Sequence, residues 1–207
     1  MAFGWFDSLG GGTSFSSPEV AATIALMCNL QPSLKTKQHI VKAILGATVL
    51  KNNRKHVTAE YAFREYGAGI IDAKSALIAV NAGHFSSTTG TVSNSNTTKS
   101  YSMSVTSSDT CMRVSLAYAH RIKFGDNVSN HTGTNAPYAG GYIGELRLDV
   151  YNPSGVLIAS CITLGANFKI LEFDPRTTGG AGIYTIKITQ TASASGGRAT
   201  NFGVSWR

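Results

Sequence analysis

The chain has 207 residues, of which 43% are hydrophobic and only 14% charged, and its formal net charge is +7. Low charge combined with 22 glycines favours a β-rich secreted, extracellular protein over a highly charged cytosolic helical one. No apolar run reaches the roughly 18 residues that a membrane span requires, so we expect no membrane partner. The first residues also lack the basic and apolar regions of a signal peptide.

An apolar helix is predicted close to the N-terminus, after the glycines at 10–12. Pro18 suits a first helical position, since its missing N–H would be unpaired there anyway. Residues 20–27 are apolar on all sides, which predicts a helix that is buried all round. Ser14 would then lie at the mouth of a glycine turn, where the N–H groups of a helix start can stabilise an oxyanion. This geometry suits a serine nucleophile, although a glycine turn followed by an ordinary serine cap is the simpler alternative.

The longer string decides between these two interpretations. Gly12-Thr13-Ser14-Phe15-Ser16-Ser17-Pro18-Glu19-Val20-Ala21 resembles the nucleophile motif of the subtilisin-like serine proteases (subtilases). The resemblance implies that Ser14 is the catalytic nucleophile and that its backbone N–H is an oxyanion donor, with Gly12, Thr13 and Pro18 shaping the turn. In that family the catalytic residues follow the order Asp, His, Ser. Too few residues precede the glycines for the Asp, His and Asn motifs, so the chain alone would be inactive.

Two further helices are expected before residue 85. Thr36 can cap the first of these, and Gly46 would end it. Asp72 can cap the next helix, at 73–82. The order of these segments is similar to the closing quarter of a subtilase catalytic domain. Residues 1–85 are therefore assigned to the C-terminal segment of such a domain.

In the second half of the chain, apolar and polar residues alternate with a period of two. Residues 86–100 are rich in Ser, Thr, Asn and Gly and are expected to be a linker or an entry to the next module. Alternating segments then predict seven or eight short strands of an antiparallel β-sandwich; they lie at 101–105, 112–118, 146–151, 156–159, 168–173, 183–188 and 202–206. Residues 86–207 resemble, more loosely, the jelly-roll modules that follow many subtilase domains. The expected fold class is thus α + β, a helical remnant of an α/β domain followed by a β-sandwich, with a loop at 125–144.

The cysteines and acidic residues give weaker signals. Cys28 would be a buried thiol, and whether Cys111 and Cys161 pair is left open. Three scattered aspartates offer a possible calcium site, but no dense run of oxygen ligands supports it, so we expect no metal and no cofactor; these residues are Asp126, Asp149 and Asp174.

The expected partners follow from the same features. Residues 31–66 hold seven basic and two acidic residues, but no aromatic residues alternate with the lysines, so a solvated helix face is favoured over a nucleic-acid partner. The partners are instead a peptide or protein substrate, together with whatever covers the apolar helix. That cover would be a missing N-terminal part of the catalytic domain or a second copy of the chain.

Two functions from different classes remain. The favoured one is the C-terminal portion of a secreted subtilisin-like serine endopeptidase, a hydrolase in which Ser14 attacks the peptide carbonyl. The alternative is a non-catalytic β-sandwich module for binding or adhesion that carries a relic protease segment.

Overall fold

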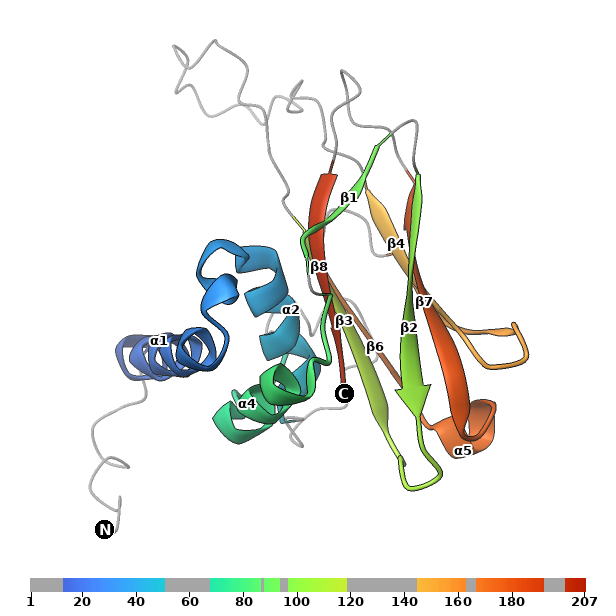
Figure 1. The fold of residues 1–207 in the computed structure, drawn as a ribbon, viewed down its shortest axis with the longest axis horizontal. Coiled ribbons are helices and arrows are strands. Elements are labelled where there is room, and N and C mark those ends of the chain that lie inside the picture. Colours follow the sequence, from blue (N-terminus) through green and yellow to red (C-terminus); the bar gives the residue numbers. More distant parts are fainter. Residues whose placement is uncertain are drawn as a thin grey trace, which may run out of the picture.

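A computed structural model describes residues 13–50, 68–86, 88–93, 97–118, 145–162, 167–191 and 200–207. Its N-terminal part is helical, and the elements described there are α1 (Thr13–Leu30), the 3-10 helix η1 (Pro32–Thr36), α2 (Gln38–Thr48) and α4 (Ala73–Ala82). Figure 1 shows these helices together on one side of the molecule.

The second part of the chain forms two antiparallel four-stranded sheets, with strand orders β1-β8-β3-β6 and β2-β7-β4-β5. The strands are β1 (Gly90–Val92), β2 (Thr98–Val105), β3 (Met112–Tyr118), β4 (Leu146–Tyr151), β5 (Leu157–Cys161), β6 (Phe168–Phe173), β7 (Gly182–Gln190) and β8 (Thr200–Trp206), with the short helix α5 (Pro175–Thr178) between β6 and β7. The α + β fold and the antiparallel sandwich that the sequence predicts are confirmed, and β3, β4 and β6 have the predicted bounds.

Alternating side chains from both sheets fill the space between them. Leu116, Leu148 and Ile188 are fully buried in this core, and Leu148 and Ile188 are direct cross-strand partners on β4 and β7. Side chains that lie opposite each other on neighbouring strands share a face of the sheet. The period of two in the sequence therefore fixes which residues face the core.

Of the two alternatives for residues 86–100, a linker or an entry to the next module, the structure supports the entry. Strand β1 and the first part of β2 lie within this segment. Strand β1 pairs with β8 from Gly90↔Phe202 to Val92↔Thr200. Small residues are needed here because Gly90 is packed against the ring of Phe202 and the hydroxyl of Tyr101.

Helix α2 lies directly on the outer face of the sheet β1-β8-β3-β6, where it packs on β8, β3 and β6. Two glycines allow this approach, one from each side. A Cβ on Gly46 of α2 would overlap the Phe168 ring, and a Cβ on Gly203 of β8 would overlap the backbone of His39 and Ile40. Gly46 was expected to end the helix, but α2 continues to Thr48, because the glycine is selected by this contact rather than by a helix end.

Two expectations for the start and the surroundings of helix α1 are wrong. Helix α1 begins at Thr13 and not near Pro18, which lies inside it and cannot donate to the carbonyl of Ser14. Helix α1 is also not buried all round: Met27 is buried but Leu26 and Leu30 are each 51% exposed, since α1 packs mainly on α4 and η1.

The capping predictions for the other two helices have opposite outcomes. Helix α2 has Lys37 at its N-cap, without a side-chain capping bond, in place of Thr36. At α4 the predicted cap is confirmed, because the Asp72 carboxylate accepts hydrogen bonds from the Ser75 N–H at 2.9 Å and its hydroxyl at 2.5 Å. These bonds hold the pKa of Asp72 below its usual value, and Gly83 ends the helix with a φ of 68°.

We expect Gly203→Ala to destabilise the protein by about 1–3 kcal/mol, the usual cost of overpacking. The added methyl group meets backbone atoms of α2, which cannot move aside as a side chain can. Urea unfolding followed by tryptophan fluorescence measures the change. A matched control is Ser102→Ala on the exposed face of β2, and an equal stability of both variants would contradict the close approach.

Candidate functional site

Ser14 lies in the first turn of α1 with its side chain exposed to solvent. Thr13 begins the same helix, and Gly12 lies outside the described residues. The two histidines of the described part, His39 and His84, are placed on α2 and after the end of α4. The catalytic role of Ser14, and the shaping roles of Gly12, Thr13 and Pro18, stay predictions.

A polar cluster occupies one end of the sandwich interior. Tyr118, Glu145 and Lys169 are 2%, 8% and 1% exposed, and the Tyr118 hydroxyl donates to Glu145 Oε2 at 3.1 Å. The Lys169 ammonium lies 5.7 Å from the centroid of the Tyr118 ring. Burial and the nearby Glu145 carboxylate raise the pKa of the Tyr118 hydroxyl far above its usual value. The phenol therefore stays protonated and remains a hydrogen-bond donor.

This cluster joins strands of both sheets where they end or begin. Tyr118 ends β3 and Lys169 follows the start of β6 in one sheet, while Glu145 precedes β4 in the other. The Glu145 carbonyl also accepts the N–H of Thr191 at 2.8 Å. Because all three side chains are closed off from solvent, the cluster acts as a structural clamp. Sequence analysis missed it, although Lys169 and Tyr118 at core-facing positions of alternating strands were the available signal.

The outer faces of the two sheets differ. Helix α2 covers the sheet β1-β8-β3-β6, whereas the outer face of β2-β7-β4-β5 lies on the side away from the helices. Its side chains form rows across the strands, as the pairing register shows. One row is Ser100, Lys187, Asp149 and Ser160, and the next is Ser102, Thr185, Tyr151 and Leu157. We call this surface the open face.

An ion pair lies at the centre of the open face. Arg147 Nε lies 2.7 Å from Asp149 Oδ2, and the Ser160 hydroxyl donates to Asp149 Oδ1 at 2.6 Å. Asp149 is only 1% exposed, and both of its carboxylate oxygens accept a hydrogen bond. The Lys187 ammonium lies 5.9 Å from the centroid of the Tyr151 ring. The open face thus holds two cations, one carboxylate, an aromatic ring and several hydroxyl groups, together with the exposed apolar side chains of Leu157 and Ile183.

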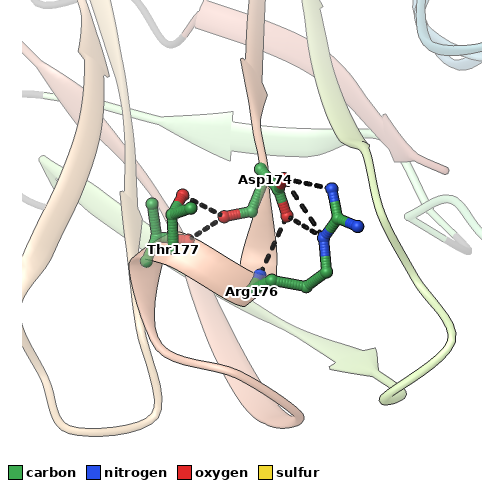
Figure 2. Close-up of polar contacts among 4 residues, drawn as sticks. Asp174, Arg176 and Thr177 are labelled. Carbon is green, nitrogen blue, oxygen red and sulfur yellow. Dashed lines mark hydrogen bonds and ion pairs between the residues drawn. The ribbon is translucent and has the colours of Figure 1, made fainter.

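Asp174 makes a similar pair in a different environment, shown in Figure 2. Its carboxylate accepts from the Arg176 guanidinium at 2.6 Å and from the Arg176 N–H at 3.0 Å, so it caps α5. These bonds lower the pKa of Asp174. Asp149 and Asp174 each have an arginine partner, and Asp126 lies outside the described residues. The expectation of no metal and no cofactor, with calcium as the alternative, stays a prediction; within the described ranges no three His, Cys, Asp or Glu side chains gather.

Comparisons with known proteins overturn the protease interpretation. No protein-family model matches the chain, and a search of curated proteins finds no significant match. Solved structures that resemble it include the pre-peptidase C-terminal domain of a collagenase from Bacillus anthracis, with 14% identity and a TM-score of 0.35 over 58% of this chain and 88% of that domain. A periplasmic inhibitor of g-type lysozyme from Aeromonas hydrophila has 14% identity and a TM-score of 0.33 over 60% of this chain and 87% of the inhibitor.

These findings correct the family and the function inferred from the motif. Neither neighbour is a subtilisin catalytic domain, so the assignment to the subtilases, and with it the endopeptidase function, is wrong. The motif at 12–21 covers only ten residues. The comparisons reported above contain no subtilase. At this level of similarity neither neighbour passes its own function to this chain. Among the described helices, none is both long and apolar enough to span a bilayer.

We expect Asp149→Ala to destabilise the protein by about 2 kcal/mol, in the range for hydrogen bonds to a charged group. Two bonded partners lose their acceptor at a buried position. Asp174→Ala is the matched control, because it removes an aspartate paired with an arginine two residues away in an exposed turn, where water screens the pair. Urea unfolding of both variants measures the difference, and a larger loss for Asp174→Ala would contradict it.

Proposed function

We propose that this chain is a non-catalytic β-sandwich module that binds a hydroxyl-rich polymer through its open face. The observation that carries the proposal is the difference between the two sheets. Helix α2 closes one outer face of the sandwich, and the other presents ordered polar side chains from four strands. A module that served only as a spacer would not require this fixed arrangement.

The chemistry of the open face matches a polysaccharide. Serine and threonine hydroxyls both donate and accept hydrogen bonds, as sugar hydroxyls do. Ser100, Ser102 and Ser104 are exposed in a line along β2, and Tyr151 supplies the one aromatic ring in the rows beside them. Arg147 and Lys187 exceed the single carboxylate of Asp149, so the surface also suits polymers that carry anionic groups.

The proposed location is outside the cytoplasm, in the periplasm or the extracellular space. The narrower proposal is that the protein is secreted. The low charged fraction of 14% and the abundance of glycine support this location. A surface-binding module in this location would hold the protein, or a partner joined to it, on a cell wall or matrix polymer.

We expect the protein to be retained by at least one insoluble polysaccharide in a panel of cellulose, chitin, xylan and bacterial cell wall. Tyr151→Ala combined with Lys187→Ala should weaken retention about tenfold, which corresponds to about 1.4 kcal/mol. Depletion of soluble protein over a range of polymer concentrations gives the affinity.

The control for this experiment is Lys74→Ala, which removes an exposed lysine from α4 on the helical side. Equal losses in the control and in the double variant would contradict binding through the open face. Failure of all four polymers to retain the protein would contradict the proposed ligand class.

We also expect no reaction of Ser14 with a fluorophosphonate probe and no cleavage of a casein substrate. A serine hydroxyl is a weak nucleophile without an adjacent base, and Ser14 is exposed in the first turn of α1. Mass spectrometry of the labelled protein, compared with Ser14→Ala, makes the measurement. Labelling at Ser14, or cleavage that disappears in Ser14→Ala, would contradict a non-catalytic module.

A further inference from the structure

A groove lies between the helices, on the far side of α2 from the open face. Its volume is about 340 Å³, and its apolar walls come from all three of α1, η1 and α2. Leu34 and Val41 are buried at its floor, whereas the side chains from α1 are half-buried. The apolar lining residues are Ile24, Cys28, Leu34, Val41 and Leu45.

The polar lining residues all come from one wall of the groove. They are Lys35 of η1 and Gln38 and Lys42 of α2, while the α1 wall contributes no polar side chain. Among the ion pairs formed by the described residues, none involves Lys35 or Lys42. The groove therefore combines an apolar lining with positive charge along one edge.

Lys42 lines the groove, and its ammonium lies beside neutral groups at the start of β6. It lies 5.4 Å from the centroid of the Phe168 ring and 3.5 Å from Asn167 Oδ1. Partial burial lowers the pKa of Lys42, and burial together with the charge of Lys42 lowers the pKa of the nearby His39. Within the described ranges no carboxylate pairs with the Lys42 ammonium, so an anion placed at this edge would add a counter-charge that those residues do not supply.

We propose that this groove binds a free fatty carboxylate, with the acyl chain along the apolar walls and the carboxylate beside Lys42 and Lys35. The volume lies near the lower end of the range of about 300–1,000 Å³ for small-molecule sites, which suits one chain better than a partner helix. Such sites are mostly apolar with a few polar groups that fix orientation. This ligand site is separate from the open face and independent of the function proposed for it.

Cys28 supplies a direct readout, because its thiol lines the groove and is partly accessible. The probe is dodecanoate below its micelle concentration, and the uncharged control ligand is dodecanol. We expect dodecanoate to slow alkylation of Cys28 by iodoacetamide and to leave the alkylation of exposed Cys111 unchanged. Mass spectrometry of the two cysteine peptides over time gives both rates.

Variants test the role of the charged edge. Lys42→Gln should weaken dodecanoate binding in calorimetry about fivefold, the change expected for a partly exposed ion pair worth about 1 kcal/mol, and should leave dodecanol binding unchanged. Lys35→Gln should act in the same direction, and Lys74→Gln on α4 is the matched control. Circular dichroism checks that each variant is folded.

Three outcomes would overturn the proposal. The first is an unchanged rate of Cys28 alkylation at saturating dodecanoate. The second is an equal effect of Lys42→Gln and Lys74→Gln on the affinity. The third is binding to anionic phospholipid vesicles without binding to monomeric dodecanoate, which would indicate a membrane surface in place of a single chain.

Discussion

The contact between helix α2 and the sheet β1-β8-β3-β6 is the constraint on which the rest of the structure depends. Gly46 and Gly203 let helix and strand backbones approach more closely than any side chain would permit. Further bonds hold the same layers together: Arg113 donates to the carbonyl of Val49, and the Ser86 N–H donates to the carbonyl of Val204 at 2.9 Å. The result is one layer of helices on two layers of sheet, with one apolar core between the sheets, a smaller one between α2 and the strands β3 and β6, and a third among the helices.

This packing makes the two outer faces of the sandwich unequal. The outer side chains of the covered sheet pack against α2, as Phe168 does against Gly46 and Lys42. The other sheet has no such requirement, so its outer side chains are free to be hydroxylated and charged. The negative charge on this face is paired, because the buried Asp149 carboxylate bonds to Arg147 and Ser160. In the binding role proposed for the open face, this arrangement would reduce the entropy cost of binding.

The elements that sequence predicted well are those fixed by local rules. A period of two located β3, β4 and β6 to the residue, since one face of each strand must be apolar. Asp72 was predicted as a cap because a carboxylate can bond to the N–H groups of the next turn. The two alternatives for residues 86–100 could not be separated from the sequence, because small polar residues are equally typical of linkers and of short, closely packed strands such as the one that contains Gly90.

The predictions that failed depend on tertiary context. Residues 20–27 are apolar on every side, and such a pattern gives no direction of packing, so the exposure of Leu26 and Leu30 could not be foreseen. The burial of Lys169 and Asp149 was not predicted for a different reason, since the burial of a charge is decided by the partners that the fold brings to it. The motif around Ser14 describes the local geometry of a helix start, and local geometry recurs in unrelated proteins. It therefore could not establish a family or a reaction.

The same helices explain why the molecule has a second candidate ligand site. Helix α1 packs mainly on α4 and η1, whereas α2 packs on the sandwich, so the described residues leave part of the apolar surface of α1 exposed. Part of that surface lines the groove beside Lys42. An apolar wall alone would favour any nonpolar occupant, and a lysine alone would favour any anion. The apolar side chains and the lysine lie a few residues apart on α2, so together they favour a molecule that has both an apolar part and a negative charge. This selectivity follows from the way α2 is held against the sheet.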